Sequence, residues 1–448
     1  KDSIGNDIWA YGGDMGFVGV ENDSNFCANG LVAANRTLHP HYWEVKRVYQ
    51  YIHFSPAPFC SNKISVRNVF DFTTLDKYEL HWDVKKDGKI TEQGKCDFPT
   101  IMPHESGLME IPFTRPDKKD SEYLLTLRVF TKEANALLPA HFEIANTQWV
   151  LSAAARTDTE TATDRQAPKM RTEKNNVFIC GKDFTAIFSK PTGELTSLCY
   201  NGKEILKNGP KPNFWRPLTD NDVASGTPKR CGTWQYAGNK MILNKFETTS
   251  RADGICIKTS YELKEQESYV ELTYTLSGDG QIKIDMHFKP GNKPLPEMLR
   301  LGTRMILAAD YDQMTWYGRG PHENYADRKE SALIDIYSAS VWEQFHPYVR
   351  AQETANKNDV RWVEIKDKED FGIRIEGYEP LNVSAWNFTQ DDIDYIPAKT
   401  AHKHGGSVER KDMVWLNIDH RLTGVGGDNT WGAQVHPEYT ITPHEWHY

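Results

Sequence analysis

Four stretches of this sequence combine glycine, asparagine and aspartate with aromatic residues, and each stretch reads as a loop. They lie at residues 11–31, 213–222, 316–328 and 415–431. Amides and carboxylates bond hydroxyl groups, and neighbouring rings cover apolar sugar faces, so such loops suit a polyhydroxyl ligand. The alternative is structural: glycines form tight turns, Asp and Asn cap them, and Arg–carboxylate pairs lock loops. The residue types alone leave both interpretations open.

Several catalytic signatures are absent from the sequence. There is no phosphate-binding G-x-x-x-x-G-K-[ST], no nucleophile elbow G-x-S-x-G and no zinc motif H-E-x-x-H. Gly424, Gly426 and Gly427 fail the dinucleotide-binding spacing, because Asn429 stands at the third glycine position. These signatures are therefore excluded.

Two small groups of possible metal ligands have a simpler interpretation. Asp391, Asp392 and Asp394 lack the glycine and the distal glutamate of a calcium loop, so we expect a solvated acidic turn. His402 and His404 stand among alanine and glycine residues, and we expect them to lie in an exposed loop.

Alternating apolar and polar residues predict antiparallel strands over most of the chain. Residues 78–85 and 123–129 alternate in this way, and Asp87-Gly88 follows the first run as a hairpin turn. About 100 residues of short strands beginning near residue 52 fit an immunoglobulin-like sandwich. The same alternation recurs at residues 184–188, 270–276 and 282–288.

Three further segments complete this outline. Residues 37–51 have helical spacing, with Thr37 suited to a cap and Pro40 to a first turn. Residues 153–176 are polar and without periodicity, which indicates a linker. Residues 177–448 are again rich in strand patterns, and their number predicts a large assembly of antiparallel sheets.

Composition limits the protein class. Of 448 residues, 39% are hydrophobic and 26% charged, the balance of a soluble globular protein. The net charge of -9 and the lack of a run of five basic residues argue against a nucleic-acid partner. No apolar run approaches the ~20 residues that span a bilayer, so we expect no membrane partner. Residues 1–20 do not form a signal peptide, and the compartment, cytoplasmic or periplasmic, stays open. The seven scattered cysteines predict buried free thiols.

Taken in order, the four loop clusters resemble those of the C-terminal half of the glycoside hydrolase family 2 β-galactosidases. The resemblance covers essentially the whole chain and implies a mainly β fold. Residues 1–51 would be the end of a TIM barrel, and residues 52–152 an immunoglobulin-like β-sandwich. A linker at 153–172 would then lead into a large antiparallel β-supersandwich of galactose-mutarotase-like type at 173–448.

The resemblance also implies roles for four residues. Phe26 would lie beside the galactose subsite and bind a sodium ion through its carbonyl, and Asn29 would be a second sodium ligand near the sugar. Trp431 would reach into the active site and form a platform for the aglycone. Asp14 would lie near the pocket. Phe26 and Asn29 would form only part of the sodium site, because the family's aspartate ligand lies upstream. For Asp222, Glu323 and Arg328 we expect loop architecture rather than substrate contact.

The family's two catalytic glutamates have no counterpart here. A retaining glycosidase needs two carboxylates ~5–5.5 Å apart. The family's acid/base glutamate follows an asparagine, and no Asn-Glu dipeptide occurs in this sequence. Both glutamates and the magnesium ligands lie upstream in the family. We therefore expect the full-length protein to be a β-galactosidase that cleaves terminal non-reducing β-D-galactose, with sodium and magnesium as cofactors, and this chain alone to be inactive.

The resemblance further implies partners: the β-galactoside, the N-terminal domains of the same enzyme, and further copies in a homo-oligomer. Two alternatives remain open. The chain could be a non-catalytic carbohydrate-binding or assembly module. It could also be a stand-alone mutarotase-like enzyme, for which His322 and Glu323 would be the candidates, although adjacent residues on a strand point to opposite faces.

Overall fold

The computed structural model describes residues 1–448 except 3, 18, 23–29, 58–61, 117–120, 154–166, 253, 398–402 and 430–431. The fold is mainly β, as predicted, and divides into two compact units. The larger unit contains Lys1–Pro40, Glu160–Lys329 and Tyr337–Tyr448, and the smaller contains His41–Thr159 and Glu330–Ile336. None of the helices in the described part has the length and apolar character needed to cross a membrane.

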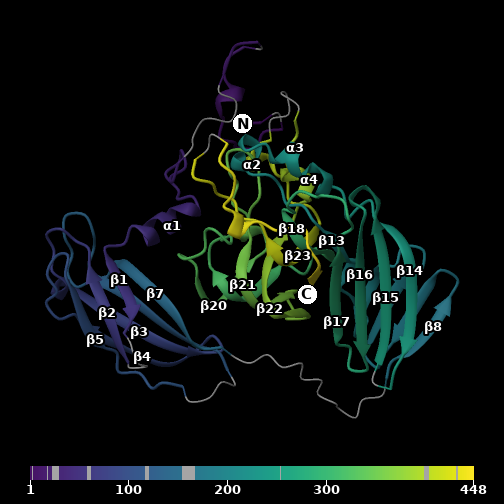
Figure 1. Cartoon of the computed structure of the whole chain (residues 1–448), viewed down its shortest axis with the longest axis horizontal. Coiled ribbons are helices and arrows are strands. Elements are labelled where there is room, and N and C mark those ends of the chain that lie inside the picture. Colours follow the sequence, from purple (N-terminus) through teal and green to yellow (C-terminus); the bar gives the residue numbers. More distant parts are fainter. Residues whose placement is uncertain are drawn as a thin grey trace. The chain divides into compact units, whose positions relative to one another are not determined.

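The smaller unit is built from two antiparallel sheets (Figure 1). One sheet has the order β1-β2-β5 and the other the order β4-β3-β6-β7. The strands are β1 (Ile52–Pro56), β2 (Lys63–Asn68), β3 (Tyr78–Lys86), β4 (Lys89–Asp97), β5 (Ser106–Glu110), β6 (Tyr123–Thr131) and β7 (Glu143–Ser152). The short 3-10 helix η2 (Leu75–Lys77) precedes β3.

Local sequence explains this pairing. Leu80 and Trp82 of β3 lie opposite Val129 and Leu127 of β6, and all four side chains are buried in the shared core. Successive residues of a strand point to opposite faces, so the alternation sends one set of side chains inward. Asp87-Gly88 forms the predicted hairpin turn between β3 and β4, with φ of 48° and 81°. These positive angles are those that a tight two-residue hairpin turn requires.

The predicted helix at 37–51 is shorter in the structure. Helix α1 spans His41–Val48. Its start is later because the preceding residues form a tight loop, in which Val32 bridges Leu38 and Ala33 N donates to Thr37 O. Thr37 is therefore held in that loop and does not cap the helix.

The larger unit contains three antiparallel sheets. The largest has the order β13-β18-β23-β22-β21-β19-β20, and two five-stranded sheets have the orders β14-β15-β16-β17-β24 and β12-β11-β10-β9-β8. The strands of the first sheet are β13 (Leu206–Asn213), β18 (Arg300–Ala308), β19 (Gln313–Gly320), β20 (Leu333–Ser340), β21 (Lys357–Lys366), β22 (Gly372–Trp386) and β23 (Met413–Leu422). Those of the second are β14 (Ile242–Ser250), β15 (Gly254–Leu263), β16 (Ser268–Ser277), β17 (Ile282–Lys289) and β24 (Trp446–His447).

The third sheet contains β8 (Lys169–Glu173), β9 (Asn176–Cys180), β10 (Phe184–Ser189), β11 (Leu195–Tyr200) and β12 (Lys203–Glu204). Strand β8 begins within the stretch expected to be linker. One continuous hydrophobic core joins residues of the three sheets, among them Phe188, Tyr274 and Leu416.

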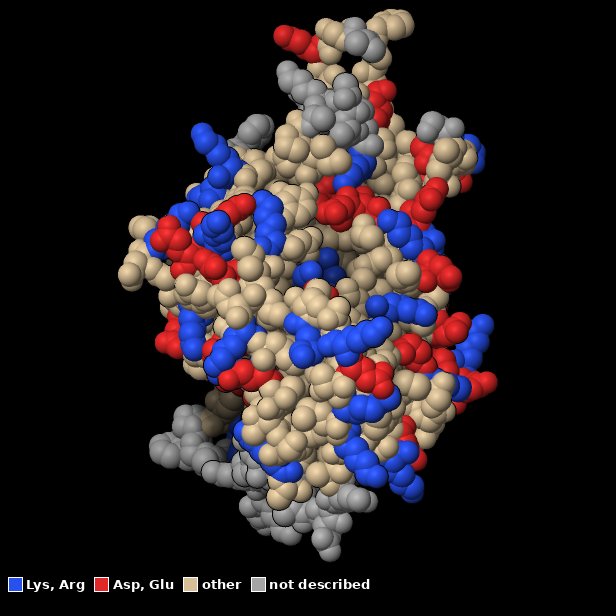
Figure 2. All heavy atoms as spheres, turned by 90° about the vertical axis from the view of Figure 1, so that its right-hand side faces the viewer, with Lys and Arg blue, Asp and Glu red and all other residues tan. Residues whose placement is uncertain are grey.

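Short helices and loops gather around residues 213–235 and 387–407 of this unit. The helices are α2 (Asp220–Ala224), α3 (Thr227–Cys231) and α4 (Gln390–Ile393), with the 3-10 helices η3 (Gly232–Trp234) and η6 (Gly405–Ser407). Figure 1 shows α2, α3 and α4 grouped near the N-terminal segment, away from the middle of the sheets. Acidic and basic side chains are interspersed over the face drawn in Figure 2.

The five described cysteines are free thiols. Cys231 and Cys256 are buried as predicted, whereas Cys96, Cys180 and Cys199 are only partly buried.

Candidate functional site

Asp14 is fixed by two contacts within the larger unit. It ends the 3-10 helix η1 (Gly12–Asp14), and its Oδ2 accepts a hydrogen bond of 2.9 Å from the backbone N–H of Tyr11. The same Oδ2 lies 2.6 Å from Nε2 of His404, on a loop 390 residues further along the chain. The Tyr11 ring stacks on the His404 ring, with centroids 4.8 Å apart. Asp14 is thus positioned by groups that local sequence does not bring together.

The loop that carries His404 packs closely on the N-terminal segment. Ser407 Oγ donates to Asp2 Oδ2 at 2.8 Å. A Cβ at Gly406 would lie 2.3 Å from the carbonyl oxygen of Asp7, so only glycine permits this approach. The expectation that His404 lies in an exposed loop is therefore wrong, since its side chain is buried against the N-terminal segment. His402 lies outside the described residues.

Tyr11 contributes shape rather than proton transfer. Its side chain is buried, and burial together with the nearby Asp14 carboxylate raises the pKa of its phenol to about 12. A phenol with so high a pKa remains protonated at neutral pH. Tyr11 therefore serves as a rigid surface for His404.

The loop that precedes Trp431 is anchored at its start by an acidic side chain. Asp327 accepts hydrogen bonds from the backbone N–H groups of Val425 at 3.1 Å and of Gly426 at 2.7 Å. A Cβ at Gly424 would lie 2.6 Å from the Asp327 carboxylate, so this approach needs glycine. Asn221 Nδ2 also donates to the carbonyl of Val425, at 3.2 Å.

A buried ion pair also holds the start of this loop. Arg216 Nη1 lies 2.6 Å from Asp222 Oδ2, and Arg216 Nη2 donates to the carbonyl of Gly424 at 2.8 Å. Asp222 also accepts from the backbone N–H of Thr219, while Thr219 Oγ1 accepts from Asp222 N, which forms a capping box at the start of α2. The ion pair therefore joins the start of this loop to the start of a helix.

Glu323 organises a neighbouring set of loops. It accepts from Arg328 Nη2 at 2.9 Å, from Thr354 Oγ1 at 2.9 Å, from the N–H of Ala355 at 2.8 Å and from the hydroxyl of Tyr348. Burial by itself would raise the pKa of Glu323, but Arg328 and these hydrogen bonds lower it to about 2. Asp222, Glu323 and Arg328 thus make the contacts of loop architecture, as expected.

Asp394 departs from the expected solvated acidic turn. It is buried, and it accepts hydrogen bonds from Trp215 Nε1 at 2.8 Å and from the backbone N–H of Leu218 at 3.0 Å. Asp391 and Asp392 stay at the partly exposed start of α4. The prediction is wrong for Asp394 because its partners are almost 180 residues away, where local composition gives no signal.

These carboxylates have a common property. Asp14, Asp222, Glu323 and Asp327 are each bound by N–H or cationic groups of the protein. A small hollow adjoins the loop at Gly426, lined also by Asn221, Thr227, Arg230, Glu297 and Gln434. The described residues of this region are therefore arranged to hold loops in place.

Family comparison decides what these loops belong to. Residues 180–448, more than half of the chain, match the model of the β-galactosidase small chain. Residues 64–152 match domain 4 of β-galactosidase, and residues 1–54 match the TIM barrel domain of the family 2 glycosyl hydrolases.

The chain belongs to the glycoside hydrolase family 2 β-galactosidases, as part of their C-terminal portion.

Curated relatives support the assignment to the family 2 β-galactosidases. A β-galactosidase of Priestia megaterium is 34% identical over 98% of this chain, and one of Halalkalibacterium halodurans is 30% identical over 98%. A third, from Clostridium acetobutylicum, is 34% identical over 75%. The aligned parts amount to 41%, 43% and 36% of those proteins, so the chain spans about two fifths of their length.

The similarity of this chain to solved structures is weak. A putative mutarotase from Salmonella typhimurium aligns over 56% of this chain and 93% of its own, with 10% identity and a TM-score of 0.29. That score is too low to support a fold assignment.

The residues predicted for the β-galactosidase site fall into two groups. Phe26, Asn29 and Trp431 lie outside the described residues. Asp14 is described, and the structure places it against His404. Sequence reasoning missed both Tyr11 and His404 as partners of Asp14. The available signal was the pair of glycines after His404, which allows two backbones to approach closely.

Proposed function

We propose that this chain is the C-terminal part of a retaining β-galactosidase, and that it completes the rim of the active site. The intact enzyme would cleave terminal non-reducing β-D-galactose. The observation that carries this proposal is the match of three successive family models, at residues 1–54, 64–152 and 180–448. The acid/base glutamate and the nucleophilic glutamate would come from a part of the enzyme outside this chain.

The anchored loop supports the role proposed for Trp431. Asp327 accepts a hydrogen bond from the N–H of Gly426, and Arg216 donates one to the carbonyl of Gly424. Both bonds are charge-assisted and hold the backbone of residues 424–426. A rigid base costs little ordering entropy when a ligand binds, so a tryptophan beyond it can serve as a platform for the aglycone. Trp431 would then bind and orient the leaving group without taking part in bond making.

Asp14 is proposed as a carboxylate beside the sugar. Its Oδ2 is occupied by Tyr11 N–H and by His404, which fixes the orientation of the carboxyl group. A carboxylate that is already oriented loses little freedom when it accepts a hydrogen bond from a sugar hydroxyl. His404 and Tyr11 would act as positioning residues for Asp14.

Sodium binding is proposed for Phe26 and Asn29 from the resemblance alone. Both lie outside the described residues. Magnesium would be held by residues elsewhere in the enzyme. Oligomerisation of the whole enzyme and binding of its N-terminal domains are likewise proposals.

The decisive experiment is hydrolysis of a chromogenic β-galactoside by this 448-residue chain, measured beside the longer protein that contains it. We expect no turnover by the chain and turnover by the longer protein. Turnover by the chain alone would mean that its own glutamates do the chemistry. Binding of galactosides by both, with turnover by neither, would favour a carbohydrate-binding module.

Trp431→Ala in the longer protein tests the platform. We expect kcat/KM to fall by about tenfold for substrates with a bulky aglycone, the effect of losing one ring contact of ~1–1.5 kcal/mol. Transfer to added acceptors should fall as well. The matched control is Tyr269→Ala, which removes an exposed ring from β16, outside the loops of the proposed site. Unchanged kinetics across several aglycones would contradict the platform role.

Two further variants of the longer protein test the other residues. Asn29→Ala should change the sodium dependence of activity, and an unaltered sodium response would refute its assignment. His404→Gln should raise KM through Asp14 while the fold stays intact, whereas equal kinetics of the variant and the parent protein would show that Asp14 needs no positioning.

A further inference from the structure

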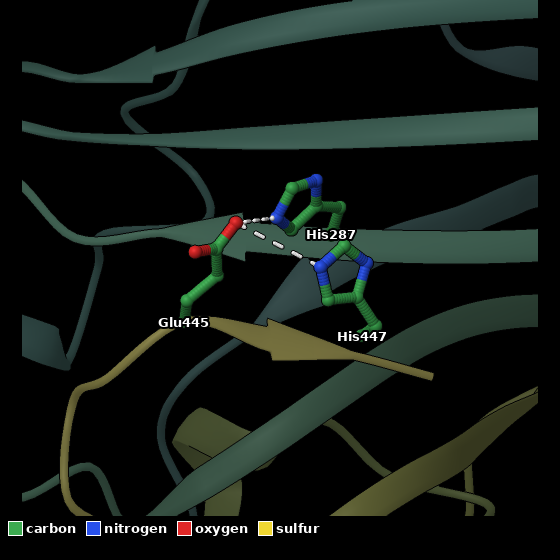
Figure 3. A group of neighbouring side chains, drawn as sticks. All are labelled: His287, Glu445 and His447. Atoms are coloured by element: carbon green, nitrogen blue, oxygen red, sulfur yellow. Dashed lines mark hydrogen bonds and ion pairs between the residues drawn. The ribbon is translucent and has the colours of Figure 1, made fainter.

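Two histidines and a glutamate, none of them part of the loops of the proposed site, converge at one edge of the second sheet. Strand β17 pairs with β24, and this register places His287 opposite His447. Directly opposed residues on antiparallel strands project from the same face of the sheet. Glu445 stands just before β24, and its carboxylate lies beside both histidines. Figure 3 shows the three side chains facing one another.

Their distances are those of a potential ligand set. His287 Nε2 lies 2.6 Å from Glu445 Oε1, and His447 Nε2 lies 3.7 Å from the same oxygen. The two imidazole rings stack with centroids 3.6 Å apart. One ligand atom from each residue falls within 4.8 Å of the others. In a tetrahedral site with bonds of ~2.0–2.2 Å the ligand atoms lie roughly 3.3–3.6 Å apart. His287 Nε2 and Glu445 Oε1 would therefore separate to admit the ion, and any more distant pair would approach.

The necessary movement falls on the exposed members. The side chains of His447 and Glu445 are 68% and 60% exposed, so their torsions are free to adjust. The His287 side chain is only 19% exposed and stands on a strand with neighbours on both sides. The set thus consists of one fixed ligand and two that can close onto an ion.

A fourth residue faces the second ring nitrogen of the fixed ligand. Glu271 of β16 lies opposite His287 in register, and its Oε2 is 3.6 Å from His287 Nδ1. Glu271 is itself held by Lys289 at 2.9 Å and Lys258 at 3.3 Å. Metal-bound histidines commonly direct their second ring nitrogen toward a carboxylate, which leaves the other nitrogen as the ligand. Here that arrangement would leave Nε2 of His287 facing Glu445 and His447.

We propose that His287, Glu445 and His447 bind a divalent transition-metal ion of the zinc class. Two imidazoles and one carboxylate are the donors that zinc takes, and a water molecule would complete four-coordination. Calcium and magnesium prefer oxygen donors and are not expected to compete. The ion would tie β24 to β17, a connection that otherwise rests on a short pairing and on the hydrogen bonds between Met286 and Tyr448.

The test is a titration of the 448-residue chain with zinc after treatment with a chelator. Because the sequence holds 15 histidines and 7 cysteines, affinity must be compared between variants. We expect calorimetry to give a site whose affinity falls at least tenfold in His447→Asn and in Glu445→Gln. The matched control is His444→Asn, since the His444 ring packs against Trp446 in a tilted arrangement and does not belong to the set.

Thermal unfolding gives an independent measure. Zinc should raise the melting temperature of the parent chain and of His444→Asn, because an ion that binds only the folded state stabilises it. It should not do so in His447→Asn, whose melting temperature without zinc should equal that of the parent chain. Equal zinc affinity in all variants, or equal loss in His444→Asn, would overturn the proposal.

Discussion

The two units bury different kinds of side chain. The core of the smaller unit is an apolar cluster between its two sheets, with Leu80, Leu127 and Val129 at its centre. The larger unit has an apolar core too, but it also buries charged groups completely, including Arg216 and Arg300. Burying a charge is expensive unless it is paired and hydrogen-bonded. The larger unit must therefore use these charges for something other than net stability.

Their positions indicate what that use is. Arg216 joins Asp222 to the carbonyl of Gly424, and Glu323 joins Arg328 to the backbone of Ala355. Each of these groups connects loops that lie far apart in the sequence. A buried ion pair adds little net stability over an apolar replacement, but breaking it is costly, so it can fix one loop arrangement.

Arg300 extends this pattern into the sheet. It lies 3.2 Å from Asp419 and 3.6 Å from Glu353, and its guanidinium stands over the ring of Trp386. Burial raises the pKa of Glu353 to about 7 and that of Asp419 to about 6, although Arg300 acts in the opposite direction on both. The larger unit thus buries ionisable groups beside its apolar core, whereas the core cluster of the smaller unit is apolar.

Loss of a buried guanidinium should have the largest effect. Arg216→Met leaves the Asp222 carboxylate buried without its cation, which should cost about 3–5 kcal/mol. Arg128→Met is the matched change in the sandwich, where Arg128 is 29% exposed beside Asp83, and it should cost about 1 kcal/mol or less. Hydrogen exchange read by mass spectrometry reports each unit separately. Equal losses of protection would mean that the two units do not differ in this respect.

Neutralising Glu323 should lower the free energy of unfolding slightly less, and the loss should depend on pH. The pKa of Glu323 is lowered to about 2 from an ordinary 4.5, so its stabilisation is complete above pH 4.5 and is lost as the pH falls through 2. Glu323→Gln should cost about 3 kcal/mol at pH 7 and little at pH 2.

Glu79→Gln in the sandwich serves as the control for Glu323. Burial raises the pKa of Glu79, but hydrogen bonds and charge from His81, Lys95 and His141 lower it overall, and the Glu79 side chain stays partly exposed. Its loss should be small at either pH. A Glu323→Gln cost that does not change with pH would show that shape, not charge, determines its contribution.

His322 provides a third test, near pH 5. Burial, with Arg328 and Lys357 nearby, lowers the pKa of His322 to about 4 from an ordinary 6.5. A base with a lowered pKa favours folding above its unfolded pKa and loses that advantage as the pH falls from 6.5 to 4. Between pH 7 and pH 5 the parent chain should therefore lose about 2 kcal/mol of unfolding free energy that His322→Gln does not lose. Unfolding curves at the two pH values measure this difference. Parallel pH profiles of parent and variant would contradict a neutral, partly buried His322.

Sequence patterns predicted the strands of both units because the information is local. Alternation over 78–85, and a turn at Asp87-Gly88, depend only on neighbouring residues, and β3 and its hairpin follow them. The roles of Asp222 and Glu323 could also be predicted, since their partners Arg216 and Arg328 stand within six residues.

What sequence reasoning missed depends on distant partners. His404 is buried only because Asp14 and Tyr11 meet it from the other end of the chain. Asp394 likewise is buried by Trp215, and the pairing of His447 with His287 depends on where β24 docks. Composition at each position favoured exposure, and tertiary contacts overrode it.

The smallest effect is expected at a helix cap, where one residue of each unit can be compared. Thr219 caps α2 in the larger unit, where its Oγ1 accepts from Asp222 N at 3.2 Å. Thr74 occupies the same position before η2 in the sandwich, but its side chain makes no capping hydrogen bond. Thr219→Ala should cost about 1 kcal/mol, and Thr219→Ser, which keeps the hydroxyl, much less. Thr74→Ala should be nearly neutral. If Thr219→Ala were equally neutral, the Arg216 ion pair would suffice to hold Asp222, and the capping box would follow from the loop arrangement instead of supporting it.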